Sequence, residues 1–118
     1  MVTAAIVTKR IIAGTIQVAA QDRQRFVHRA TQDIARSRAE AGCLRYVISR
    51  DLEREDTFHL SEVWADKAAL DAHLASPEFR AMLADVSTMA IKAWGVMLYE
   101  AGESSPIGLP RRSTQGAS

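Results

Sequence analysis

The spacing of hydrophobic residues switches between two periods along this chain. Residues 10–20 are apolar and rich in residues that favour strands, and Gly14 inside them marks a bulge or a close backbone approach. Over residues 22–40 the apolar positions recur about every four residues, with charged residues between them. The pattern predicts a first strand followed by an amphipathic helix. The expected buried stripe of that helix is Phe26, Val27, Ala30, Ile34 and Ala35.

The next section of the chain has the two-residue period of strands. Gly42 follows the helix where a left-handed cap is usual, and residues 43–52 are rich in β-branched and aromatic residues. After a charged turn, residues 58–65 alternate clearly. The sequence therefore predicts a β-hairpin between the second and third strands. One face of the third strand is expected to carry Phe58, Leu60, Glu62 and Trp64, and the other His59, Ser61 and Val63.

A second helical region begins at residue 67 and is interrupted. Asp66 can cap a helix from Lys67, and Ser76 followed by Pro77 is a new helix-start signal. Residues 90–100 then close the pattern as a fourth strand. The segment beyond them is rich in proline and glycine and is expected to be a flexible tail, or an arm laid on a partner.

The order β-α-β-β-α-β predicts an α+β fold of the ferredoxin-like kind, with helices on one face of an antiparallel four-stranded sheet. We expect one domain over residues 10–100, an N-terminal extension over 1–9 and the tail over 101–118. The bare sheet face carries apolar residues, so a second copy is its expected cover. The sequence thus predicts a homodimer formed through the sheet faces.

Composition excludes several classes of partner. Lysine and arginine total 15 against 14 acidic residues, so no strong positive field is present to attract nucleic acid or an anionic membrane. No apolar run reaches the ~20 residues of a membrane span, and the N-terminus lacks a secretory signal, so the default expectation is a cytoplasmic protein. Cys43 is the only cysteine, which precludes an intrachain disulfide, and we expect it to pack in the core.

Two stretches carry a family resemblance: "GCLRY" at 42–46 and "FHLSEVWADKAALDAHLASPEF" at 58–79. They resemble the antibiotic biosynthesis monooxygenase family, whose members are ferredoxin-like chains that pair into a dimeric α/β barrel. The resemblance extends over roughly residues 10 to 100. It implies oxidation of a quinol, phenol or polycyclic aromatic by molecular oxygen, without cofactor or metal, in a cavity between sheet and helices. The asparagine that haem-degrading relatives carry on the first strand has no counterpart here, so no haem is expected.

Such chemistry requires a base, because a cofactor-free enzyme must make the substrate itself the electron donor to oxygen. His73 is the only histidine on an apolar helical face, and an imidazole can accept the proton of a phenol if donors stabilise the anion. Trp64 offers a stacking surface and an indole N–H, and Tyr46 a second donor. The predicted catalytic residues are therefore His73, Trp64 and Tyr46.

Each of these residues also has a plainer interpretation. His73 can be a core histidine bonded to a carbonyl group, Trp64 core filling, and Tyr46 one member of a cross-strand pair. Glu62 can orient a donor or His73, or pair with an arginine. The residues expected to bind substrate are Leu60, Glu62, Leu70, Phe79 and Leu83.

The two remaining histidines are expected elsewhere: His28 in solvent, and His59 facing away from Trp64 towards the dimer partner. The three histidines lack a metal-binding spacing such as H-E-x-x-H, so no metal site is predicted. Two rival functions stay open. One is a non-catalytic protein that binds a hydrophobic metabolite, and the other is an isomerase or similar proton-transfer enzyme.

Overall fold

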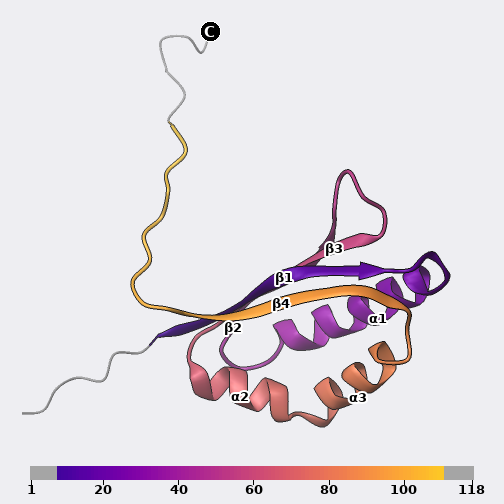
Figure 1. Ribbon diagram of the computed structural model, residues 1–118. Coiled ribbons are helices and arrows are strands. Elements are labelled where there is room, and N and C mark those ends of the chain that lie inside the picture. The colour runs from indigo at the N-terminus through magenta and orange to yellow at the C-terminus, as the bar shows by residue number, and fades with distance from the viewer. Residues whose placement is uncertain (1–7, 111–118) are drawn as a thin grey trace, which may run out of the picture.

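The computed structural model describes residues 8–110 of the 118-residue chain, with the element order β1-α1-β2-β3-α2-α3-β4 (Figure 1). The predicted order of strands and helices, including the interruption in the second helical region, is confirmed. The strands are β1 (Lys9–Val18), β2 (Cys43–Arg50), β3 (Thr57–Trp64) and β4 (Ile91–Ala101), and the helices are α1 (Ala20–Arg38), α2 (Lys67–Ala75) and α3 (Pro77–Val86).

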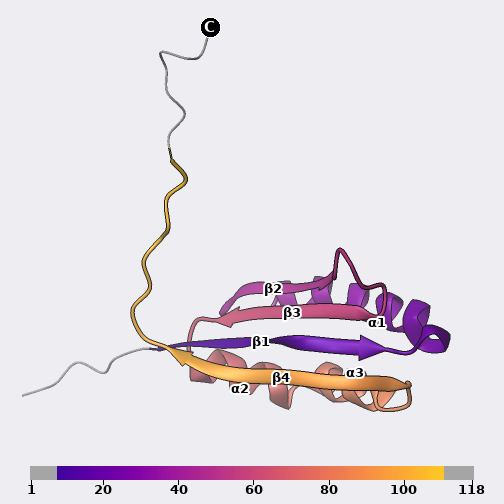
Figure 2. The same cartoon turned by 45° about the horizontal axis from the view of Figure 1, so that its top comes forward.

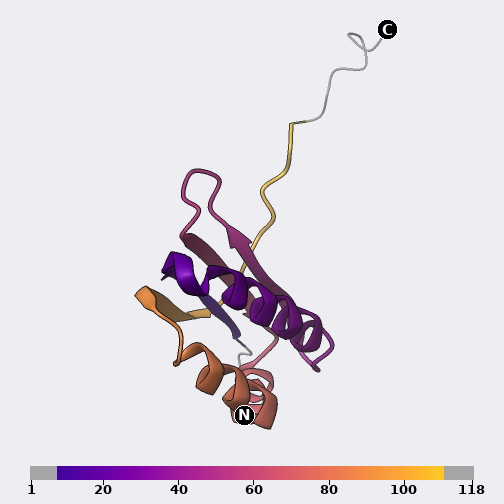
Figure 3. The same cartoon turned by 90° about the vertical axis from the view of Figure 1, so that its right-hand side faces the viewer.

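The four strands form one antiparallel sheet in the order β2-β3-β1-β4 (Figure 2). All three helices lie on the same face of this sheet, and the opposite face is bare (Figures 1 and 3). This is the predicted ferredoxin-like α+β fold. None of the helices in residues 8–110 is long and apolar enough to cross a membrane.

Local signals in the sequence account for the element boundaries. Asp66 accepts a hydrogen bond from the Ala69 N–H at 2.8 Å and caps α2. Ser76 accepts one from the Phe79 N–H at 3.1 Å, and Pro77 occupies the first turn of α3. The break between α2 and α3 therefore follows from a new cap formed within one residue of the end of α2.

Two glycines are required by the backbone. Gly42 has φ +79°, the predicted left-handed conformation, but it lies in the turn before β2, whereas Ala39 caps α1 in a right-handed conformation. A β-carbon on Gly14 would overlap the backbone of Gly95 and Val96, so the close approach of β1 to β4 needs a glycine there. The irregularity in β1 lies between Gln17 and Val18 rather than at Gly14.

The core fills the space between the sheet and the helices. The residues of α1 that are buried against it differ from the predicted stripe. Phe26 and Ala30 are buried as predicted, but Val27 and Ala35 are exposed. The next buried positions of α1 are Asp33 and Ser37. The helix is therefore rotated relative to the hydrophobic stripe, and the burial of Asp33 is tolerated because Arg29 and Arg36 lie beside its carboxylate.

The ends of the chain lie partly outside the described residues. The predicted extension over 1–9 is described only at Thr8 and Lys9, and the predicted tail only as far as Pro110. Residues 102–110 leave the end of β4 and run away from the domain without regular secondary structure (Figure 1).

Candidate active site

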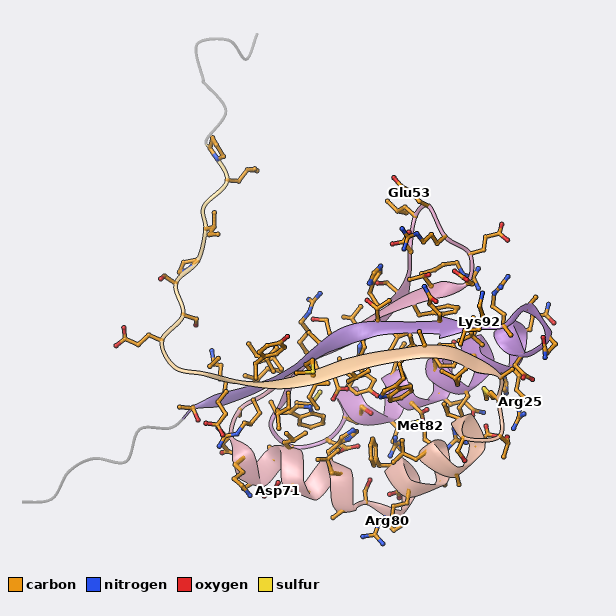
Figure 4. The ribbon with its side chains drawn as sticks, viewed as in Figure 1. Arg25, Glu53, Asp71, Arg80, Met82 and Lys92 are labelled. Atoms are coloured by element: carbon orange, nitrogen blue, oxygen red, sulfur yellow. The ribbon has the colours of Figure 1, made fainter. Side chains whose placement is uncertain are left out.

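A cavity of about 170 Å³ lies between the helix-covered face of the sheet and the helices. Most of its lining is aliphatic or aromatic and comes from all four strands and all three helices. Figure 4 shows the side chain of Met82, one of the lining residues, between α3 and the sheet. The lining also includes four polar side chains: Arg29, Asp33, Tyr46 and Glu62.

The cavity reaches the surface beside β4. Trp94 of β4 and Leu83 of α3 both line it, and they are 50% and 40% exposed. A pocket whose apolar wall is partly open to solvent can admit an apolar ligand without unfolding the core. The mouth therefore lies between β4 and α3.

The predicted binding residues divide into those that line the cavity and one that does not. Leu60, Glu62, Phe79 and Leu83 line it, whereas Leu70 is packed in the core beside Tyr46 and Trp64. One turn along α2, Leu74 lines the cavity instead. The helix spacing identified the correct face of α2, but could not show how deep each leucine lies.

Glu62 is a buried carboxyl group in the cavity wall. Its side chain is 4% exposed, and Oε1 accepts a hydrogen bond of 2.9 Å from the indole Nε1–H of Trp64. Within residues 8–110 no arginine, lysine or histidine forms an ion pair with it, so the expected arginine partner is absent. Burial raises the pKa of Glu62 from 4.5 to about 7. The hydrogen bond from Trp64 lowers this pKa, and the negative charge of Glu40 raises it further.

Tyr46 stands directly opposite Glu62 in the antiparallel β2–β3 pair and lines the same cavity. Burial raises the pKa of the Tyr46 hydroxyl above its usual 10, and the negative charge of Glu62 raises it further. The hydroxyl therefore keeps its proton at neutral pH, which leaves it able to donate a hydrogen bond.

His73 lies behind the cavity wall. Its ring is 1% exposed and packs against Trp64 and Phe79, with ring centroids 4.5 and 4.9 Å away. Nδ1 lies 3.0 and 3.1 Å from the two carboxylate oxygens of Glu40, so Glu40 rather than Glu62 orients the imidazole. Nε2 is buried without a hydrogen-bond partner among residues 8–110. His73 and Trp64 are not among the residues that line the cavity, although each touches a residue that does.

The helix wall contains a second buried carboxyl group, which sequence patterns did not reveal. Asp33 is 4% exposed, and its carboxylate lies 3.5 Å from Arg29 Nε and 3.4 Å from Arg36 Nη2. Burial raises the pKa of Asp33, while both arginines oppose that rise. The arginines at i−4 and i+3 were the available signal, because only a paired aspartate is expected in the buried seam of a helix.

The other titratable candidates lie apart from the cavity. His28 is exposed on α1, as expected. His59 lies on the bare face of the sheet, with Nε2 2.8 Å from Asp51 Oδ1. No group of three or more histidine, cysteine, aspartate or glutamate side chains within residues 8–110 could hold a metal ion.

Comparison with known proteins places these features in a family context. The family model for antibiotic biosynthesis monooxygenases matches residues 10–85. An uncharacterized protein of Synechocystis is 28% identical over 97 residues, which are 82% of this chain. The chain spans 66% of the length of that relative, slightly under two thirds. The Bacillus subtilis protein named "Putative monooxygenase YcnE" is 30% identical over 74 residues, covering 63% of this chain and 78% of the relative.

Solved structures show the same fold. A crystal structure of "a putative antibiotic biosynthesis monooxygenase" from Deinococcus radiodurans superposes with a TM-score of 0.78 at 27% identity, covering 84% of this chain and 98% of the other. A Pseudomonas aeruginosa protein superposes with a TM-score of 0.70 at 25% identity, covering 86% of this chain and all of the other. The similarity therefore extends over the sheet and its helices.

Proposed function

The chain belongs to the antibiotic biosynthesis monooxygenase family, and from this premise we propose that it is a cofactor-independent monooxygenase acting on a small aromatic quinol or phenol. The observation that carries the proposal is the apolar cavity with a carboxyl group in its wall that has no cationic partner among residues 8–110. A phenol needs an apolar slot for its ring and a proton acceptor for its hydroxyl, and this cavity offers both.

The chemistry balances without an added reductant. Dioxygen accepts four electrons, two from oxidation of the quinol to the quinone and two from a ring C–H bond. The O–O bond breaks, one oxygen atom enters that C–H bond as a hydroxyl group, and the other takes up the two quinol hydroxyl protons and leaves as water. The product is a hydroxyquinone. The first step is removal of a proton, because the phenolate gives up an electron more readily than the neutral phenol, whose pKa is near 10 like that of tyrosine.

The size of the cavity favours a single-ring substrate within the quinol, phenol and polycyclic range. A volume of 170 Å³ is close to the ~150 Å³ of an apolar protein cavity known to bind benzene. A polycyclic substrate would require the mouth between Trp94 and Leu83 to widen. We therefore expect single-ring quinols to be turned over faster than fused-ring analogues.

Oxygen uptake by the metal-free, flavin-free protein tests this function. Hydroquinone should be consumed faster than it autoxidises, and a fused-ring hydroquinone more slowly. Ala30→Leu should abolish uptake because Ala30 is buried in the cavity wall, whereas Ala35→Leu on the exposed side of α1 is the matched control. Tight binding without uptake would instead support a binding protein, and hydrogen exchange on the substrate without uptake would support an isomerase.

We also propose that the protein is a homodimer through the bare sheet face. Register places Ile11, Val63 and Tyr99 side by side on that face, and Met97 beside them is 58% exposed. An apolar sheet face is stable in water when a second copy covers it. Sedimentation should show a dimer for the wild type and a monomer for Met97→Arg, while Leu52→Arg in the exposed β2–β3 loop should stay dimeric. A monomeric wild type would contradict the proposal.

A further inference from the structure

We infer that Glu62 is the proton acceptor of this site and that His73 is a positioning residue that acts on it through Trp64. The inference rests on the proposed function, because it names the group that receives the substrate proton. The phenolic O–H bond breaks, its electron pair stays on the phenolate oxygen, and the proton moves to Oε2 of Glu62. The proton leaves Glu62 when dioxygen is reduced to water.

Only four polar side chains line the cavity in the described part of the chain, and three of them cannot accept this proton readily. Arg29 offers N–H donors and no acceptor atom. Asp33 lies between two guanidinium groups, and each of its carboxylate oxygens already faces one of them, Oδ2 at 3.5 Å from Arg29 and Oδ1 at 3.4 Å from Arg36. Tyr46 already carries its proton. Among the residues that the structure describes, Glu62 alone combines a place in the cavity wall, no cationic partner, and an oxygen that Trp64 does not use.

Burial makes Glu62 a stronger base than an ordinary carboxylate. With a pKa raised to about 7, Glu62 is partly ionised at neutral pH. This pKa is also closer to that of a phenol than the ordinary carboxyl value of 4.5 is. General bases work best when their pKa lies near the operating pH. This agrees with the assignment that the geometry makes independently.

Two contacts connect His73 to Glu62 without placing His73 in the cavity, and a third anchors His73 itself. Glu40 binds Nδ1 of His73, the imidazole ring packs on the Trp64 ring at 4.5 Å, and the indole N–H of Trp64 binds Glu62 Oε1 at 2.9 Å. Each contact fixes the next group. His73 therefore holds the Trp64 ring at the angle that presents Glu62 to the cavity. The sequence suggested His73 as the base, so the two assignments exclude each other and can be tested against one another.

Titratable groups face Glu62 from three neighbouring elements. From the end of α1, the Glu40 carboxylate raises the Glu62 pKa, and from α2 His73 lies behind Trp64. From β2, Tyr46 and Cys43 are close enough for the Glu62 charge to raise their own pKa values. A pH response of the site can arise in several of these groups, so variants are needed to assign it.

The test is the pH dependence of phenol binding without oxygen, measured by calorimetry from pH 5 to 9. Phenol donates its hydroxyl proton more strongly to a carboxylate than to a carboxylic acid. Wild-type affinity should therefore rise about tenfold, with a midpoint near pH 7, since a hydrogen bond to a charged group is worth roughly this factor.

Three variants assign that rise. Glu62→Gln keeps an oxygen for the Trp64 N–H and should bind phenol with no pH dependence. Asp33→Asn, the matched control on the opposite wall, should keep the rise. His73→Asn should keep the rise too, although with weaker affinity, because its amide can still donate to Glu40. A rise that survives in Glu62→Gln and disappears in His73→Asn would overturn the inference.

Oxygen uptake with hydroquinone separates this inference from the proposed function. We expect Glu62→Gln to lose 10²–10⁴-fold in uptake, the usual contribution of a positioned base. If the wild type binds phenol with the predicted rise but consumes no oxygen, the monooxygenase proposal fails and the proton acceptor stands. If the wild type consumes oxygen and Glu62→Gln does so equally, the acceptor assignment fails alone. Absence of phenol binding by the wild type would overturn both.

Discussion

The sheet wall and the helix wall of the cavity each bury one carboxyl group, and the neighbours of the two groups differ. Asp33 in the helix wall lies between Arg29 and Arg36, whereas Glu62 in the sheet wall receives only an indole N–H. Both have raised pKa values from burial, but cations oppose the rise only at Asp33. The two walls therefore hold the same kind of side chain in different surroundings: Asp33 is ion-paired, and Glu62 is the carboxyl group that we propose exchanges a proton.

The largest expected stability effect is at Glu62. Its pKa of about 7 in the fold, against 4.5 normally, means that the folded state binds more protons than the unfolded chain between these pH values. The free energy of unfolding should therefore fall by about 3 kcal/mol as pH rises from 4.5 through 7. Glu62→Gln should lack this decrease, so urea unfolding should show it to be more stable than the wild type at pH 8. Parallel curves for the two proteins would contradict the account.

A smaller effect is expected from the donor that serves Glu62. Trp64→Phe removes the N–H that lowers the Glu62 pKa, so the midpoint of the phenol-affinity rise should move above the wild-type value. The lost ring volume and hydrogen bond should also cost about 1–3 kcal/mol of stability, because Trp64 is fully buried.

Trp94→Phe is the control of the same residue type. Trp94 is half exposed at the mouth of the cavity, so this change should cost under about 1 kcal/mol. It should also leave the midpoint of the pH response unchanged. A shift of that midpoint in Trp94→Phe, or none in Trp64→Phe, would show that Trp64 does not set the protonation of Glu62.

The smallest effect is expected at Asp33, despite its deep burial. Attraction from the two arginines and the cost of desolvating the carboxylate oppose each other, and the raised pKa shows that desolvation is the larger. Asp33→Asn should therefore change the free energy of unfolding by less than about 1 kcal/mol at pH 7. Chemical denaturation would measure this, and a loss above 3 kcal/mol would mean that the helix wall depends on this charge.

The fold could be predicted because each element carries a local signal. The alternation from Phe58 to Trp64 and the caps at Asp66 and Ser76 all predicted structure that is observed. Charges were harder to place, because burial of Asp33 depends on how α1 rotates over the sheet rather than on its apolar pattern. Val27 and Ala35 were misplaced for the same reason.

The sequence predicted several of the residues that form the site, but not the contacts that join them. The sequence placed Glu62 and Trp64 on one face of the third strand and Tyr46 on the neighbouring strand, and the observed register sets Tyr46 directly opposite Glu62. It could not show that Glu40 binds His73, since that contact joins residues that are far apart in the chain. The depth of His73 behind Trp64 is likewise a property of tertiary packing, which spacing alone does not encode.

Titration of the Glu62 side-chain carboxyl group by carbon-13 NMR tests the central claim most directly. Spectra of glutamate-labelled wild type and Glu62→Gln identify the resonance by its absence in the variant. We expect a midpoint near pH 7 that moves lower when phenol is bound, because the phenol hydroxyl stabilises the carboxylate. A midpoint near 4.5, unaffected by phenol, would show that Glu62 is an ordinary carboxylate and would contradict its role as the proton acceptor.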